Sequence, residues 1–169
     1  VKAEEASQIR LPAQPEGSYR LRITMHRREG TSTIGVILPV GRNQVRLMLS
    51  GFGGLVSGLG SIDGRRADEN ETAVKPGTID NENPHTIVAD VRLDGDQATI
   101  KVELDGKPYI QWTGDPRLLD VQQMWRLKGT DTLGVGAHLS VIEFQAIDIA
   151  PIDDDPIRKL RQPATDAPK

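Results

Sequence analysis

Residues 97–112, QATIKVELDGKPYIQW, have the clearest pattern of secondary structure in the chain. Its first eight residues alternate polar and apolar side chains, and this period of two places the two kinds on opposite faces of a β-strand. Asp105-Gly106 follows at once, a dipeptide typical of two-residue hairpin turns because both central residues take a positive φ. Ile110 and Trp112 then share one phase on the return strand. The stretch predicts an antiparallel hairpin with one buried face and a buried Trp112.

The same alternation recurs along most of the chain between short turn signals. Together the alternating segments amount to about ten short strands with almost no helix, a pattern typical of all-β folds. We therefore predict a two-sheet antiparallel β-sandwich of the jelly-roll, concanavalin A-like type. The alternating segments outside the hairpin are residues 19–26, 34–40, 45–49, 85–93, 133–139 and 141–149.

Three local features add detail to this fold. The first three alternating segments are joined by short turns, which predicts an antiparallel meander. The phase of the apolar residues changes along the last segment, which predicts a β-bulge near Gln145-Ala146. Residues 117–127 are the one candidate for a helix, of one or two turns, that caps an end of the sandwich.

The two ends of the chain lack a clear period. Residues 1–17 mix charge with proline and glycine, and we interpret them as an arm with a short first strand around residues 9–11. Residues 18–150 form the β-sandwich domain, and the charged, proline-rich residues 151–169 form a tail or linker. The chain begins at Val1 without an initiator methionine. We therefore expect it to be a piece of a longer polypeptide.

The composition excludes several classes of protein. The 169 residues are 37% hydrophobic and 27% charged, with a formal net charge of −3 and no cysteine. Scattered basic residues and a negative net charge argue against a nucleic-acid partner. The longest apolar runs, such as residues 34–40, are too short for direct insertion into a membrane. Without cysteine the chain has no disulfide, no thiolate metal site and no cysteine nucleophile.

Four stretches resemble bacterial concanavalin A-like (laminin G-like) jelly-roll domains, most closely the family that includes 3-keto-disaccharide hydrolase-like domains of unknown function. The resemblance implies a concave sheet and rim loops that hold a saccharide, and an extracytoplasmic location in the periplasm or at the cell surface. It carries over no catalytic residue. The stretches are SYRLRITMHR (18–27), IGVILPVG with NQVRLMLSGFGG (34–41 and 43–54), residues 85–115, and TLGVGAHLSVIEFQAIDI (132–149).

Aromatic residues are candidates for a sugar site, because an aromatic face stacks on the C–H face of a pyranose ring. Trp125 lies in an irregular segment and either lines a cleft or plugs the core. Phe52, between glycines, is either a rim platform or a plug, and Tyr109 is expected to be exposed. We expect the ligand on the concave sheet, near the glycine-rich stretch 50–64. The candidate ligand-binding residues are Arg46, Phe52, Glu103, Tyr109, Trp125 and His138.

Catalytic and metal sites have weaker sequence support. A glycosidase needs two carboxyls about 5 to 9 Å apart. Glu103 and Asp105 have the right alternation, but the turn already explains Asp105. No cofactor is predicted. Calcium stays open as a rim ligand, since Asp63, Asp94, Asp96 and residues 80–83 offer hard oxygens, although turns favour these residue types for local reasons.

Three functions follow as alternatives. The leading hypothesis is a non-catalytic carbohydrate-binding or adhesion-type module of a larger exported bacterial protein, with a saccharide as partner. The second is an enzyme that cleaves a glycosidic bond, of the 3-keto-disaccharide hydrolase-like type. The third is a protein-interaction or structural module, which predicts a flat, filled concave face and an exposed apolar patch.

Overall fold

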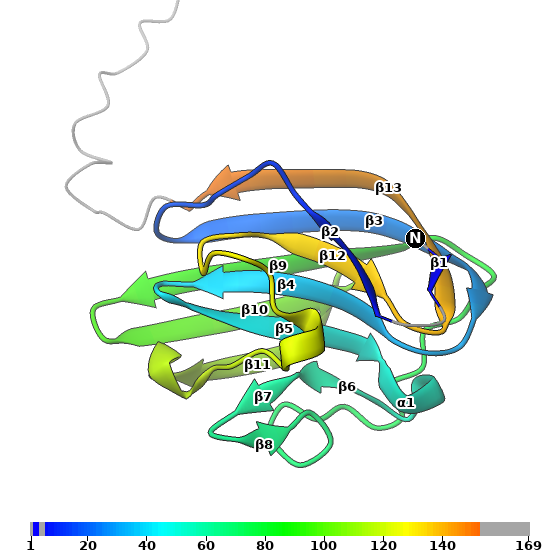
Figure 1. Cartoon of the computed structure of the whole chain (residues 1–169), viewed down its shortest axis with the longest axis horizontal. Helices are drawn as coiled ribbons and strands as arrows, with labels where there is room; N and C mark the ends of the chain where they lie inside the picture. The colour runs from blue at the N-terminus through cyan, green and yellow to red at the C-terminus, as the bar shows by residue number, and fades with distance from the viewer. Residues whose placement is uncertain (1, 4–5, 153–169) are drawn as a thin grey trace, which may run out of the picture.

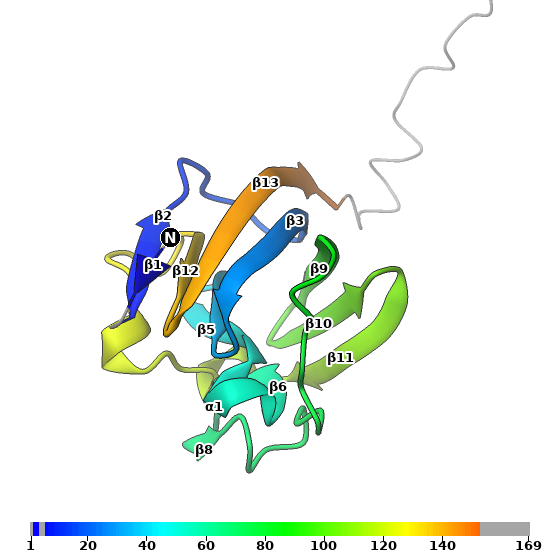
Figure 2. The same cartoon turned by 90° about the vertical axis from the view of Figure 1, so that its right-hand side faces the viewer.

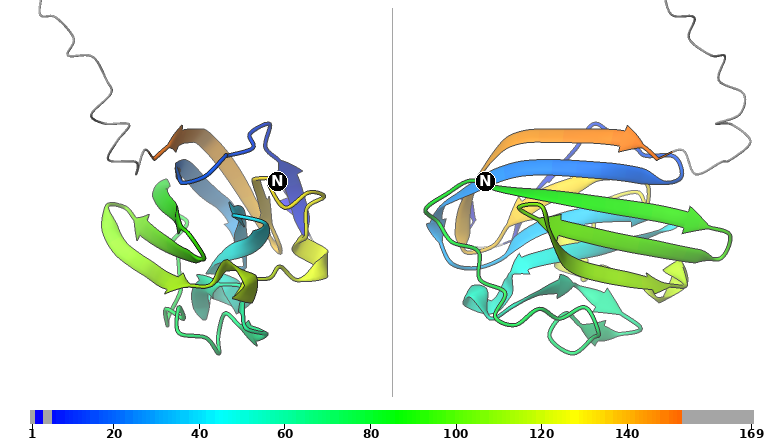
Figure 3. Two further views of the ribbon diagram at one scale, coloured as in Figure 1. Left: turned by 90° about the vertical axis from the view of Figure 1, so that its left-hand side faces the viewer. Right: turned by 180° about the vertical axis from the view of Figure 1, so that it is seen from behind.

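Alternating strands build two antiparallel sheets that face each other across a shared core, as predicted (Figure 1). The computed structural model describes residues 2–3 and 6–152. The six-stranded sheet has the order β1-β13-β3-β9-β10-β11, and Figure 3 shows it from behind. Its strands are β1 (Lys2–Ala3), β3 (Tyr19–Gly30), β9 (His85–Asp94), β10 (Gln97–Leu104), β11 (Lys107–Gly114) and β13 (Ser140–Pro151).

The second sheet has five strands in the order β2-β12-β4-β5-β6, and Figure 2 shows the two layers from one end. A separate two-stranded sheet pairs β7 (Ser61–Ile62) with β8 (Arg65–Arg66). The five strands are β2 (Ser7–Arg10), β4 (Ile34–Val40), β5 (Asn43–Ser50), β6 (Val56–Leu59) and β12 (Gly134–Ala137).

The hairpin of β10 and β11 forms as predicted. Asp105 and Gly106 have φ of 52° and 74°, the left-handed conformation that the Asp-Gly signal requires. Ile100 pairs with Trp112, and both side chains are buried between the sheets. Tyr109 differs from the expectation that it is exposed. A register shift after Val102 turns it to the margin of the core, where it is half-buried.

The predicted meander is wrong, because the chain changes sheet after its first long strand. β3 pairs with β9 and β13, whereas β4 pairs with β5 and β12 in the other sheet. Alternation indicates which side chains of a strand face the core. The same alternation is expected whether the next strand in sequence pairs within the same sheet or lies in the opposite sheet. β4 and β5 do form a hairpin, with Val36 opposite Leu47.

The N-terminal residues add one edge strand to each of the two main sheets. β1 pairs with β13, and β2 pairs with β12, so residues expected to form an arm contribute to both sheets. The predicted bulge in β13 is confirmed by a register shift between Phe144 and Ala146. Most of the predicted tail, residues 153–169, lies outside the described residues.

The candidate helix at residues 117–127 forms only two 3-10 turns, η1 (Pro116–Leu118) and η2 (Gln123–Trp125). The segment that contains η2, yellow in Figure 1, lies against the outer face of the five-stranded sheet. Within the described residues, no helix has the length and apolar character needed to cross a membrane.

Glycines on the outer face of the five-stranded sheet make room for Trp125. A Cβ built on Gly35 would lie 2.4 Å from Cζ3 of Trp125, and one on Gly136 would lie 3.0 Å from the same atom. The indole also packs with Ile37 and Val121 in a small second core. This cover explains why β4 is buried on both faces, where alternation predicted a single buried face.

Candidate functional site

A cavity of about 530 Å³ opens on the outer face of the five-stranded sheet. Val45 and Leu47 point into the shared core, so Arg46 between them points outward and forms part of the cavity wall. We call this feature the Arg46 cavity. It brings together four of the predicted site residues: Arg46, Phe52, Trp125 and His138. The other lining residues are 30–33, Met48, Gly53, Arg66, Gln122, Met124 and Leu139.

Arg46 is the most unusual residue of the cavity. Its residue surface is only 6% exposed, and its guanidinium carbon lies 4.8 Å from the centroid of the Trp125 ring. Its Nη2 also donates to Sδ of Met48, at 3.4 Å. Burial lowers the pKa of Arg46 to about 10, because desolvation disfavours the charged form. The side chain is therefore still a cation at neutral pH.

Phe52 stands at the rim of the cavity and is 50% exposed. It lies in the short turn α1 (Gly51–Gly54) with φ 53° and ψ 44°. This left-handed conformation is costly for a bulky residue and persists only where the surroundings impose it. The guanidinium of Arg66 covers one side of the ring at 5.3 Å. Leu139, which also lines the cavity and is 53% exposed, has a positive φ of 50° as well.

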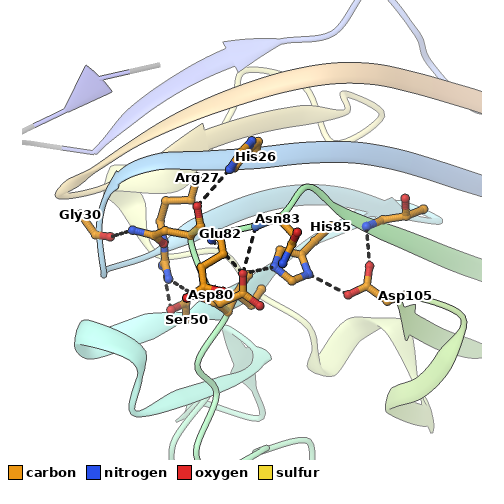
Figure 4. A network of polar contacts seen from close by, with 12 residues as sticks. His26, Arg27, Gly30, Ser50, Asp80, Glu82, Asn83, His85 and Asp105 are labelled. Atoms are coloured by element: carbon orange, nitrogen blue, oxygen red, sulfur yellow. Dashed lines mark hydrogen bonds and ion pairs between the residues drawn. The ribbon is translucent and has the colours of Figure 1, made fainter.

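A buried arginine fixes the backbone behind this rim (Figure 4). Arg27, 2% exposed, donates hydrogen bonds to Oγ of Ser50 at 2.8 Å and to the carbonyl of Ser32 at 3.0 Å. It also donates to Oδ1 of Asn81 and to the carbonyl of Ile79. Burial lowers its pKa, and the nearby charge of Asp80 opposes that effect. One guanidinium thus ties three separate segments together beside the cavity.

The neighbouring loop is held by a second network (Figure 4). Nδ1 of His85 lies 2.7 Å from Oδ2 of Asp105, whose Oδ1 accepts from the amide of Thr86. Oδ1 of Asp80 accepts from the amides of Glu82 and Asn83, and these bonds lower the pKa of Asp80. Asp105 therefore has two roles, as a turn residue and as an anchor for this loop.

Two of the predicted site residues lie elsewhere. Glu103, on β10, alternates with the buried Val102 and faces away from the core on the six-stranded sheet. Tyr109 lies on β11 of that same sheet. Arg46 faces away from the core on the other sheet, so Glu103 and Arg46 point to opposite sides of the molecule. The predicted residues do not form a single site.

The acidic residues considered for calcium are dispersed. Asp63 lies in the turn between β7 and β8, and Asp94 and Asp96 flank the turn before β10. Asp80 is engaged by the loop amides described above. Within the described residues, no group of three or more His, Cys, Asp or Glu side chains is arranged to hold a metal ion. Calcium binding stays a prediction.

Several cavity residues were missed by the sequence argument. Met48 shares the phase of Arg46 on β5, so alternation alone was enough to place it on the same face. Arg66 lies in a segment without a period and Met124 in the segment predicted as a short helix, and no sequence signal connects either residue with β5. Leu139 continues an inward phase in sequence, but its positive φ turns it to the surface.

Among known proteins, the chain is similar to solved structures but matches no sequence family. No protein-family model matches the chain, and no curated protein matches it. A legume lectin-like domain from Entamoeba histolytica is similar in structure at 10% sequence identity, over 87% of this chain and 79% of that one, with a TM-score of 0.52. The chain shares a lectin-type β-sandwich fold. At this identity the likeness extends to the fold alone.

Two further structures have lower scores. Sheep galectin-11, solved in complex with glycerol, matches over 89% of this chain and 99% of its own, with 10% identity and a TM-score of 0.46. A GH43 protein from Bacillus licheniformis matches over 81% of this chain and 28% of its own, with 11% identity and a TM-score of 0.48. Both TM-scores lie below 0.5, so neither match supports a conclusion about this chain.

Proposed function

We propose that the chain is a non-catalytic carbohydrate-binding module and that its ligand enters the Arg46 cavity. The observation that carries the proposal is Phe52, a half-exposed aromatic held in a strained backbone at the mouth of a sizeable cavity. An aromatic face offers a platform for the C–H face of a sugar ring. Thr33 and Gln122 in the wall supply polar groups that can orient hydroxyls.

The enzyme alternative gains less support from the same cavity. Hydrolysis of a glycosidic bond needs a pair of carboxyls at the bond. Among the described residues that line the cavity, none is Asp or Glu. Asp90, on the other sheet, has a pKa lowered mainly by its hydrogen bonds with Arg20, which is the opposite of what a general acid requires.

A protein-interaction role has one observation in its favour. Phe52, Leu55, Met124 and Leu139 are all at least half-exposed, and three of them rim the cavity. Exposed apolar groups of this kind also mark protein contacts. A saccharide accounts better for a recessed cavity whose largely apolar wall also contains polar side chains such as Thr33 and Gln122, because protein interfaces are commonly flatter. Binding to a glycan separates the two roles.

The test combines a glycan array, with and without calcium, and the variant Phe52→Gly. Glycine adopts the left-handed conformation without strain, so the substitution should leave the thermal midpoint unchanged or raise it. Loss of the platform should weaken glycan binding by up to about tenfold, since aromatic stacking contributes about 0.5–1.5 kcal/mol beyond buried area and about 1.4 kcal/mol is tenfold.

Leu118→Ala serves as the matched control. Leu118 is 42% exposed on η1 and does not line the cavity, so its loss should leave glycan affinity unchanged. The proposal fails if no glycan binds in either calcium condition, or if Phe52→Gly binds as tightly as the unaltered chain.

Three finer points stay predictions. The relationship to laminin G-like and 3-keto-disaccharide hydrolase-like domains rests on the four sequence stretches alone. Placement in the periplasm or at the cell surface, as part of a longer exported polypeptide, rests on the same resemblance. Calcium dependence is tested by the two conditions of the array.

A further inference from the structure

The Arg46 cavity is basic although the chain as a whole is acidic. Its wall contains Arg46, Arg66 and His138, and the described lining residues include no carboxylate, whereas the whole chain carries a formal net charge of −3. Arg66 already forms an ion pair with Asp68, with Nη2 2.8 Å from Oδ2. The positive charge that is left for a ligand is therefore centred on Arg46.

The two buried arginines differ in their hydrogen-bond acceptors. Arg27 is 2% exposed, and its guanidinium donates to four oxygens. Arg46 is 6% exposed, yet no oxygen of the described residues accepts a hydrogen bond from its guanidinium. It faces the Trp125 ring and the sulfur of Met48 instead. A buried cation without a partner is costly, and an anion in the cavity would offset that cost.

We propose that the Arg46 cavity recognises an acidic saccharide, with the carboxylate of a uronic acid residue bound to the guanidinium of Arg46. This inference rests on the proposed function and adds the chemical class of its ligand. A guanidinium matches a planar carboxylate through paired, charge-assisted hydrogen bonds. One unpartnered arginine also matches the single charge of one uronate.

The rest of the cavity fits the remainder of such a ligand. Phe52 and Leu139 on the rim are apolar and exposed, which suits the C–H faces of a sugar ring. The side chains of Thr31 and Thr33 offer hydroxyls along the wall. A carboxylate at Arg46 and a ring at the rim give the ligand a defined orientation. A free inorganic anion would use Arg46 and leave the rim empty.

The experiment measures dissociation constants by calorimetry for matched pairs of ligands. The probes are tetramers of galacturonic, glucuronic and mannuronic acid, each beside its carboxyl-reduced, uncharged counterpart. We expect at least one acid to bind about tenfold to a hundredfold more tightly than its reduced form, the range for a charge-assisted hydrogen bond. The preference should weaken as sodium chloride is added, because salt screens the charge.

Two variants assign the preference to one residue. Arg46→Met replaces the buried cation by an apolar side chain that can still contact Trp125. It should remove the preference for the acid and leave the thermal midpoint of the unliganded protein unchanged or higher. Lys101→Met makes the same change of net charge on an exposed residue of β10, in the opposite sheet, and should keep the preference.

The outcomes separate this inference from the function on which it rests. Equal affinity for an acid and its reduced form would overturn the uronate specificity and leave the saccharide site in place. No binding of any tetramer, charged or reduced, would overturn both. Binding of a sulfated galactan tetramer in preference to every uronate would also overturn the carboxylate assignment. Tight binding of a short peptide through its C-terminal carboxylate, when no sugar binds, would likewise overturn the assignment of the ligand as a uronate.

Discussion

Arg27→Met is expected to lower the free energy of unfolding by about 3–5 kcal/mol, the cost of removing one partner from a buried, charged hydrogen-bond network. The variant leaves the carbonyls of Ser32 and Ile79 without their donor. It also frees Ser50 and Asn81, which hold two separate segments in place. Urea unfolding at neutral pH measures the loss directly.

Arg28→Met is the matched control for this prediction. Arg28 is the next residue of β3, and its ion pair with Glu143 is about half-exposed on both sides, at 2.6 Å. Exposed pairs of this kind contribute roughly 0–1 kcal/mol. If both variants lower the free energy of unfolding by the same amount, the hydrogen bonds of Arg27 do not hold the segments beside the cavity together.

Gly35→Val is the second substitution with a large expected effect. The backbone at Gly35 is an ordinary strand, where valine is normally favoured. A Cβ at this position would nonetheless lie 2.4 Å from the Trp125 ring. Forcing the indole off the sheet should cost about 3 kcal/mol or more, through overpacking and the loss of its buried contacts.

A double-mutant cycle assigns that cost to the indole. Trp125→Ala alone should cost about 3–5 kcal/mol, because it empties a buried site. In that background Gly35→Val should cost far less than in the unaltered chain, since the valine then occupies vacated space. Chemical denaturation of the four proteins gives the coupling. If the losses in free energy of unfolding are strictly additive, Trp125 does not pack against Gly35.

The hairpin and the sandwich were predictable because alternation is a local property. Residues 97–112 specify their faces and their turn within one short stretch, but the register of Ile100 with Trp112 also depends on a shift after Val102 that the alternation does not predict. The choice of sheet is not local. β4 joins the sheet opposite β3, and no pattern within either strand distinguishes that outcome from a meander. For the same reason the sequence grouped Glu103 with Arg46, although they lie on opposite faces.

The site was only partly predictable, because it forms where separate segments meet. Phe52 and Trp125 were predicted as site residues because they are aromatic residues in irregular segments. Nothing in the sequence indicates that Trp125 packs against Gly35. Arg27 did leave a signal. It continues the inward phase of Leu21, Ile23 and Met25, and an arginine in that phase must find buried acceptors.

The central claim is that a saccharide occupies the Arg46 cavity on the five-stranded sheet. The most direct test is to titrate the isotope-labelled chain with each uronic acid tetramer and its carboxyl-reduced counterpart in turn, and to map the amide chemical-shift changes. We predict that the largest changes cluster at Phe52, Gly53, His138 and Leu139. A map centred instead on Lys101, Glu103 and Gln111, or no change at any amide, would contradict the account.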